Sequence, residues 1–323
     1  MKLPRRAFLH GAAVAAVLSA ATHVASALDY PARAVHIIVA FPAASGPDIV
    51  TRLVAQRLSE RLGQQFIVEN RPGAGGSLAA QTVVNAAADG YTLLTATSAN
   101  AVNATLYPNL NFNFIRDVAP VAFISGVPFV MVVNPAVPAR TIPEFVAYAK
   151  ANPYKVNVAS AGIGSTTHLC YELFKMMTGL ELVHVPYRAS YLPDLIGGQV
   201  QGAFSTVPQA IEYIRHGELR ALAVTSTARV DALPDIPSMG EFVPDYESDG
   251  WFGIVAPKTT RGEIIGKLNS EINAAVADPK MTAQLRDLGV LPMSMAPVEF
   301  GQLIADRTEK WAKVIKVAGI KLE

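Results

Sequence analysis

Short apolar runs alternate with amphipathic helical stretches along most of the chain. Residues 34–40 (AVHIIVA) form a continuous apolar run of the kind found in buried strands. In the next segment, residues 49–58, apolar positions recur every three to four residues, and Gly63 follows as a helix stop. This order of strand and then helix is repeated further along, which is typical of a parallel sheet covered by helices. The pattern predicts an α/β fold.

Other strands are expected where short β-branched or apolar runs are bounded by turn residues. These runs are residues 66–69, 92–97, 118–124, 156–159, 182–185, 202–204 and 221–225. Other helices are expected where apolar residues keep the helical spacing between a cap and a stop. These stretches are residues 77–87, 141–152, 165–177, 263–277, 279–289 and a last helix that runs through Trp311.

Two further runs differ from ordinary core strands. Residues 129–133 have a proline on each side, and residues 251–256 (WFGIVA) follow a long segment rich in proline, aspartate and glycine. Flanking prolines suit a strand that crosses between lobes better than one in the middle of a sheet. We therefore predict two crossover strands. Residues 28–127 and 250–323 would form one lobe, residues 128–249 the other, with the ligand cleft between them.

The N-terminus has the composition of an export signal. Lys2 and the pair Arg5 and Arg6 precede a short alanine-rich apolar stretch and a small-residue cleavage motif at residues 25–27 (ASA). The arginine pair resembles a twin-arginine signal, although the general export route stays open. We expect residues 1–27 to be removed and the mature protein to reside in the periplasm.

Composition narrows the possible partners and stabilising devices. The 323 residues are 51% apolar and 16% charged, which is ample for a folded core. Basic and acidic residues number 27 and 26, and no basic stripe interleaved with aromatics occurs, so we expect no nucleic-acid partner. Loss of the signal removes three basic residues and leaves a net charge of −2. The single cysteine, Cys170, cannot form an internal disulfide, and its apolar neighbours predict a buried structural thiol.

Two loops rich in small residues each join a predicted strand to a helix. They are residues 41–48 (FPAASGPD) and residues 160–168 (SAGIGSTTH), one in each predicted lobe. The free N–H groups of a helix start carry partial positive charge, so an anion fits there without lysine or arginine. Such a loop is also a common plain connection, and His168 suits either the cleft or a structural role. A third loop, residues 70–77, lacks the dinucleotide fingerprint and is expected to cap a helix and support the cleft.

Residues for an enzymatic reaction are sparse. The chain has no G-x-S-x-G elbow, no H-E-x-x-H motif and no cysteine cluster. The four histidines of the mature chain are scattered. We therefore expect no metal, no cofactor and no catalysis. The alternative is a secreted oxidoreductase or hydrolase that acts on a small carboxylate.

Several long phrases, in this order, resemble the solute-binding proteins of tripartite tricarboxylate transporters, also called the Bug family, to which TctC belongs. They are residues 37–43 (IIVAFPA), 68–76 (VENRPGAGG), 88–94 (ADGYTLL), 160–169 (SAGIGSTTHL), 184–187 (HVPY), 197–200 (GGQV), 219–225 (LRALAVT) and 251–253 (WFG). The resemblance covers essentially the whole mature chain.

The resemblance implies the type II periplasmic binding protein fold and a receptor that closes on a small carboxylate and presents it to membrane permease subunits. It implies no cofactor, and we expect a monomer. Backbone amides at two helix starts would hold the carboxylate. The ligand-binding residues carried over on this basis are Phe41, Ala43, Ala44, Ser45, Ser98, Ala161, Gly162, Gly164, Ser165, Thr166, His168, Tyr187, Arg188 and Ser205.

The chain departs from the family pattern near the expected far end of the site. Ser205 stands where we expect many relatives to have an aspartate, so we predict a ligand without a primary amine. Arg188 either pairs with a second carboxylate or is a solvated surface arginine. Tyr187 and Tyr191 are candidates for stacking on an aromatic acid, so aromatic acids and aliphatic di- or tricarboxylates both remain open.

Overall fold

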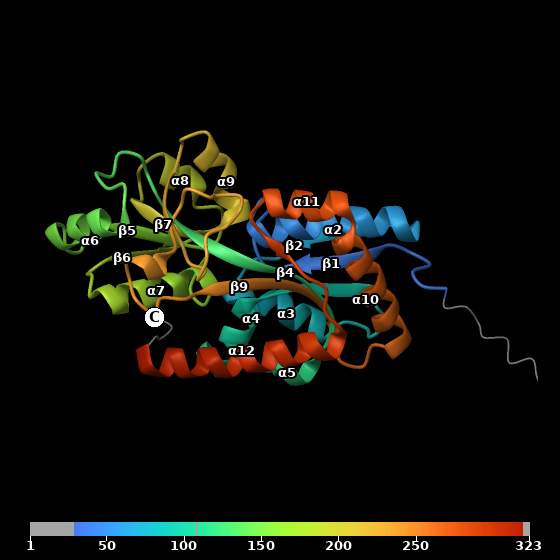
Figure 1. The fold of residues 1–323 in the computed structure, drawn as a ribbon. Coiled ribbons are helices and arrows are strands. Elements are labelled where there is room, and N and C mark those ends of the chain that lie inside the picture. Colours follow the sequence, from blue (N-terminus) through green and yellow to red (C-terminus); the bar gives the residue numbers. More distant parts are fainter. Residues whose placement is uncertain (1–28, 108, 319–323) are drawn as a thin grey trace, which may run out of the picture.

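The computed structural model describes residues 29–107 and 109–318, so the predicted export signal, residues 1–27, lies outside the described residues. The elements gather into two α/β lobes that lie side by side (Figure 1). The first lobe contains β1 (Val35–Val39), α2 (Gly46–Leu62), β2 (Phe66–Asn70), η1 (Ala74–Gly76), α3 (Ser77–Val84), β3 (Thr92–Thr97), α4 (Ser98–Leu106) and α5 (Phe114–Asp117). The C-terminal part of the chain adds β9 (Asp249–Pro257), α10 (Gly262–Ala277), α11 (Pro279–Asp287), β10 (Leu291–Pro292) and α12 (Pro297–Ala318).

The second lobe is built from the middle of the chain. It contains α6 (Ile142–Ala151), β5 (Asn157–Ser160), α7 (Thr166–Thr178), β6 (Val183–Pro186), α8 (Leu192–Ile196), β7 (Gly202–Thr206), α9 (Val207–Arg215), β8 (Arg220–Val224) and the short η2 (Met239–Glu241). The predicted α/β class and the two-lobed architecture are confirmed.

One long strand, β4 (Val118–Val133), passes through both lobes (Figure 1). Its first part, residues 118–128, pairs with β9, and its last part, residues 129–133, pairs with β7 and β8. The sequence analysis predicted two separate strands here, residues 118–124 and 129–133, and this prediction is wrong. The proline at position 120 lies beside a register shift, where a strand tolerates a missing N–H donor, and Pro128 lies where β4 changes partners.

The sheet order is β2-β1-β3-β9-β4 in the first lobe and β4-β7-β5-β6 in the second, with β8 also on β4. β1 is parallel to β2 and β3, and β5 is parallel to β6 and β7. Parallel strands direct their carboxyl ends to the same edge of a sheet. Helices that follow them therefore begin at that edge, which in open α/β sheets is where ligands bind.

Four α-helices of the described residues were not predicted: α4, α5, α8 and α9. α4 and α9 follow β3 and β7 without a connecting residue, so no loop composition announces them. Weak local signals are present. Asn100 Oδ1 accepts a hydrogen bond from Thr97 N at the start of α4, and a proline occupies the first turn of α9. Both helices matter for the site described below.

Helices cover both faces of each sheet and bury separate cores. α2 and α10 pack on one face of the first sheet, and α3 and α12 on the other. In the second lobe, α6 and α7 cover one face and α8 and α9 the other. Cys170 lies fully buried in this lobe, where its thiol contacts Ser248 Oγ at 3.2 Å and burial raises its pKa to about 12. The prediction of a buried structural thiol is confirmed.

A smaller apolar cluster joins the lobes along α12, which runs beside both of them (Figure 1). Leu169 of the second lobe packs there with Val102 of α4 and with Trp311 and Ile315 of α12. The C-terminal helix thus continues past Trp311, where the prediction placed its last residues, and holds the two lobes near each other on this side.

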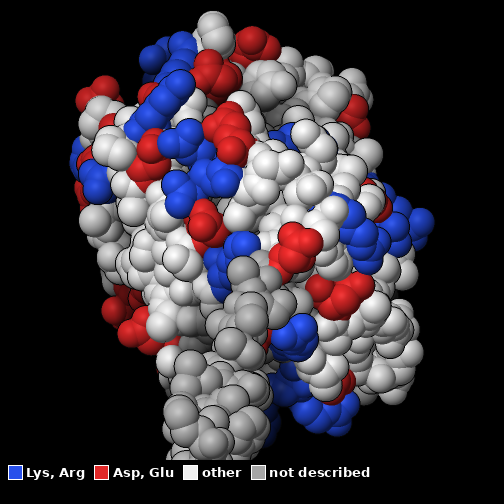
Figure 2. Space-filling model, turned by 90° about the vertical axis from the view of Figure 1, so that its right-hand side faces the viewer, with Lys and Arg blue, Asp and Glu red and all other residues white. Residues whose placement is uncertain are grey.

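Charged side chains of both signs are interspersed on the face of the first lobe that Figure 2 shows. Ion pairs such as Arg57 with Asp278 and Arg61 with Glu271 join α2 to the C-terminal helices. Across residues 29–107 and 109–318, no helix combines the length and the apolar character that crossing a membrane requires.

Candidate functional site

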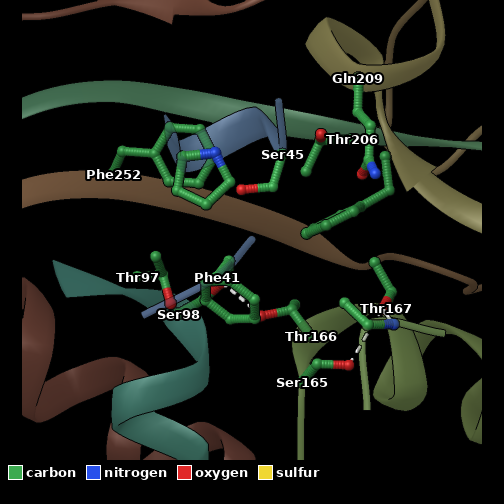
Figure 3. Close-up of a pocket in the computed structure, with 13 residues that line it drawn as sticks. Phe41, Ser45, Thr97, Ser98, Ser165, Thr166, Thr167, Thr206, Gln209 and Phe252 are labelled. Carbon is green, nitrogen blue, oxygen red and sulfur yellow. Dashed lines mark hydrogen bonds between the residues drawn. The ribbon is translucent and has the colours of Figure 1, made fainter. Parts of the chain in front are cut away.

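A cavity lies where four helices begin, two from each lobe (Figure 3). Its volume is ≈ 390 Å³, including the part open to solvent. α2 and α4 reach it from the first lobe, and α7 and α9 from the second. The residues that line it are Phe41, Ser45, Pro47, Thr97, Ser98, Phe129, Ala161, Ser165, Thr166, Thr167, Thr206, Gln209 and Phe252.

The lining carries no charged side chain, yet it is rich in hydrogen-bond donors. The first N–H groups of a helix have no partner within the helix, and the helix dipole adds partial positive charge at this end. Pro47 and Pro208 remove one such donor each from α2 and α9. Four helix starts that converge on one cavity make a seat for an anion that needs no lysine or arginine.

Three hydroxyls in the cavity wall have no hydrogen-bond partner among the described residues: Ser45 Oγ, Thr97 Oγ1 and Thr206 Oγ1. All three side chains are more than nine-tenths buried. Buried polar groups are almost always hydrogen-bonded, because desolvation without a partner costs about 1–3 kcal/mol. The three hydroxyls thus leave unused hydrogen-bonding capacity in the wall of one cavity.

Aromatic rings form the remaining walls. Phe41, Phe129 and Phe252 line the cavity, and each is buried. These rings exclude water and so strengthen the electrostatic effect of the helix starts. The cavity thus suits a molecule with an acidic group and an apolar body.

Asp48 fixes the loop that leads into α2. It is 2% exposed, and its carboxylate accepts hydrogen bonds from Ala44 N at 2.9 Å and from Asn70 Nδ2 at 2.8 Å. Arg52, one turn further along α2, pairs with the same carboxylate. The loop therefore turns Ala43 and Ala44 outward, where both are exposed, and directs Ser45 inward.

The loop before α7 is held by a second set of contacts. Ser165 Oγ accepts from His168 N at 3.2 Å, as a helix cap, and donates to Gly162 O at 2.6 Å. Gly164 N donates to His168 Nδ1 at 3.4 Å. The His168 ring is 4% exposed and stacks on the ring of His184, with centroids 4.4 Å apart. Gly164 N and His168 thus bond to each other instead of lining the cavity.

The stacked histidines predict a pH-dependent stability. Burial, with His168 nearby, lowers the pKa of His184 to about 4 from its usual value near 6.5. The folded protein then binds fewer protons than the unfolded chain between these values, so the free energy of unfolding falls as pH drops from about 6.5 to 4. Chemical unfolding across this range should show a shallower decline for His184→Gln. His216→Gln, which changes an exposed histidine, is the control, and equal slopes for His184→Gln and the unmodified chain would contradict the prediction.

A second cavity of ≈ 750 Å³, open to solvent in part, adjoins the first and shares Phe41 and Ala161 with it. Glycines of η1 and its loop line one side, and Gly162, Tyr187 and Arg188 line the other. The 70–77 loop, for which the sequence predicted a supporting role, thus contributes residues to the wall of this second cavity. Arg188 is exposed, and no ion pair of Arg188 occurs among the described residues.

The structure brings only some of the proposed ligand-binding residues together. Phe41, Ser45, Ser98, Ala161, Ser165 and Thr166 line the first cavity, and Gly162, Tyr187 and Arg188 line the second. Ala43, Ala44, Gly164, His168 and Ser205 line neither. The sequence did not single out Thr97, Phe129, Thr167, Thr206, Gln209 or Phe252, which line the first cavity.

Strand geometry explains the place of Ser205. Neighbouring residues of a strand point to opposite faces, so at the end of β7 only one of Ser205 and Thr206 can face the cavity. Thr206 does so, whereas Ser205 is fully buried behind it and contacts Tyr191 Oη at 2.9 Å. Tyr191 is likewise a core residue, not a wall of either cavity. The sequence alone does not show which of two neighbouring residues at a strand end faces the cavity, because that depends on which side of the sheet the cavity lies.

Within the described part of the chain, no group of three or more histidine, cysteine, aspartate or glutamate side chains is arranged to hold a metal ion. The fold and the cavity together define a class: a two-lobed binding protein with a cavity between the lobes that helix starts and hydroxyls line.

Comparison with known proteins gives the family within this class. The family model described as "Tripartite tricarboxylate transporter family receptor" (TctC) matches residues 50–320. Protein BugT of Bordetella pertussis is 36% identical over 321 residues, which cover 98% of this chain and 96% of BugT. The structure of R. palustris Rpa4515 with adipate has a TM-score of 0.88 at 35% identity, and the match covers 91% of this chain and 99% of Rpa4515. MatC (Rpa3494) from Rhodopseudomonas palustris with bound malate has a TM-score of 0.84 at 30% identity, over 88% of this chain and 100% of MatC.

The chain belongs to the TctC family of tripartite tricarboxylate transporter receptors, and it is a solute-binding receptor of the Bug type. The family resemblance drawn from the sequence phrases is confirmed.

Proposed function

We propose that the mature protein captures a small organic carboxylate in the periplasm and delivers it to the membrane subunits of a tripartite tricarboxylate-type transporter. The observation that carries the proposal is the uncharged cavity at four helix starts, with three buried hydroxyls that lack partners. The carboxylates adipate and malate in the solved relatives Rpa4515 and MatC support it.

We propose that the lobes, residues 28–127 with 250–323 and residues 128–249, close on the ligand about β4 and the segment before β9. The exchange of partners in β4 at position 128 supports this division. The bond between Ser98 Oγ and Thr166 Oγ1, 2.9 Å long, joins the lobes beside the cavity. A ligand that contacts both lobes favours the closed form, because only that form supplies all its contacts.

The ligand of this proposal has no primary amine. A buried ammonium group needs an anionic partner, and the lining holds none. We propose that the receptor acts as a monomer and releases its ligand unchanged.

A thermal-shift screen of the purified mature protein, followed by mass spectrometry of the incubated ligand, tests the proposal. Ligand at about 100 times its dissociation constant adds roughly 2.7 kcal/mol and should raise the melting temperature by several degrees. We expect small carboxylates to give this shift and to be recovered unaltered. Consumption of the ligand would favour an oxidoreductase or hydrolase instead, and larger shifts with amino acids than with amine-free acids would contradict the ligand class.

Export is expected to remove the signal after Ala27. The basic start, the apolar stretch and the small residues at positions 25–27 motivate this prediction. N-terminal sequencing of periplasmic protein should therefore begin at Leu28, and a start far from this residue would contradict it. Replacement of Arg5 and Arg6 by lysine should block export only if the twin-arginine route is used.

A further inference from the structure

We propose that Gln209 is a specificity-determining residue that donates a hydrogen bond to the far end of the ligand. The ligand would then be an acid with a second oxygen acceptor at that end, foremost a dicarboxylate. This inference rests on the proposed function and adds to it the residue that reads the second group. It places the selection among ligands on α9, a helix that the sequence did not predict.

The position of Gln209 makes the contact possible. It lies in the first turn of α9, is half-buried, and extends toward the cavity from the second lobe (Figure 3). Thr206, with its unpaired hydroxyl, lies beside it in the same wall. Gln209, Thr206 and the N-terminus of α9 together make one end of the cavity polar.

The Gln209 amide faces two buried hydroxyls with its oxygen. Its Oε1 lies 3.3 Å from Tyr191 Oη and 3.5 Å from Ser205 Oγ, and it accepts a hydrogen bond from this hydroxyl pair. Tyr191 and Ser205 are 1% and 0% exposed, so they lie behind the cavity wall and not in it. With the oxygen engaged on that side, the Nε2 hydrogens are the groups that Gln209 offers to a ligand.

Ser205 thus affects the site indirectly, through its contact with the Gln209 side chain. Its hydroxyl accepts a hydrogen bond from Tyr191 Oη at 2.9 Å, and its own hydrogen is then free to be donated to the amide oxygen. A donor at this end selects for a carboxylate, carbonyl or hydroxyl oxygen, and it rejects an ammonium group, which brings only donors. A methyl group at the same place would leave the amide unpaired and also lose affinity.

Matched ligands test which group the far end accepts. Calorimetric titration would compare linear diacids from malonate to adipate with the monoacids and the ω-amino acids of the same length, such as glutarate with pentanoate and 4-aminobutyrate. We expect the best diacid to bind at least about tenfold more tightly than its matched monoacid, and the amino acid to bind weakest.

Two variants then assign the preference to Gln209. Gln209→Leu should reduce diacid affinity by about tenfold and raise monoacid affinity, because the methyl end of a monoacid then no longer leaves the amide unpaired. Gln209→Glu places a carboxylate at this end, so it should weaken diacids by about 100-fold and improve the amino acid. Gln199→Glu adds the same charge at an exposed site of the same lobe and should change neither ligand class. Melting temperatures of the unliganded variants check that each remains folded.

Other outcomes overturn the inference. Equal binding of diacids and monoacids, or tighter binding of amino acids, would mean that the far end is apolar or that the amide is turned the other way. Loss of the diacid preference in Arg188→Gln, with Gln209→Leu unaffected, would assign the second carboxylate to the adjoining cavity. If no acid of any class binds, the proposed function itself fails, and the inference falls with it.

Discussion

Gly46→Ala is expected to weaken ligand binding by about 100-fold or more, which corresponds to roughly 2.7 kcal/mol, without unfolding the protein. Gly46 is the first residue of α2 and faces Thr206 of the other lobe. A Cβ atom there would overlap Thr206 Oγ1 and lie 2.8 Å from Thr206 Cβ and 3.0 Å from Cγ2. No rotation of the threonine side chain removes the contact with Cβ. Opening of the lobes would remove this contact, so the substitution should disfavour the closed form of the protein.

Gly262→Ala is the matched control, because Gly262 is also the first residue of a helix and has no atom within 4 Å of its added Cβ. Isothermal titration should show the loss only in Gly46→Ala, and melting of the unliganded proteins should show similar stability for both variants. Unchanged affinity in Gly46→Ala would mean that ligand binding does not require the close approach of α2 to α9.

Gly164→Pro is expected to reduce ligand affinity by one to two orders of magnitude, about 1.4–2.8 kcal/mol. Gly164 has a φ of +80°, whereas proline requires a φ near −65°. Proline would also remove the N–H that donates to His168 Nδ1. The loop that places Ser165 and Thr166 in the cavity wall must then take another path, so the effect comes through these residues.

A second pair of variants separates loop geometry from general strain. Gly164→Ala puts a Cβ 2.8 Å from Asn103 Oδ1 and 3.0 Å from the Tyr107 ring, both in the other lobe. Gly179→Ala imposes similar backbone strain at a φ of +63°, with no atom within 4 Å. Titration should show weaker binding for Gly164→Ala than for Gly179→Ala, while both lose some stability. Full affinity in Gly164→Pro would remove this loop from the site.

Local patterns were sufficient for elements that carry their own start and stop signals. Gly63 and Gly179 end α2 and α7 in the left-handed conformation, and the side chain of Thr141 caps α6, as the sequence indicated. β3 occupies the predicted residues. These features depend on residues close together in the chain, which is why periodicity and capping residues reveal them.

The candidate site was only half visible in the sequence. The loops before α2 and α7 contain glycine and small residues, and both lead to the cavity. α4 and α9 begin directly at strand ends, so they lack such loops, and the contributions of Thr97, Thr206 and Gln209 were missed. Their only local marks were a polar residue and a proline in the first turn, which are common in any helix start.

The amino-acid sequence by itself determined the α/β class, the two-lobed organisation, the family, and the two small-residue loops, because each depends on local composition or on phrases of adjacent residues. The tertiary structure alone decided that four helix starts meet, that Thr206 and not Ser205 faces the cavity, and that β4 is one strand through both lobes. These facts arise from strand pairing and from the packing of segments far apart in the chain. Pairwise contacts of that kind are set by the whole fold, so no local pattern encodes them.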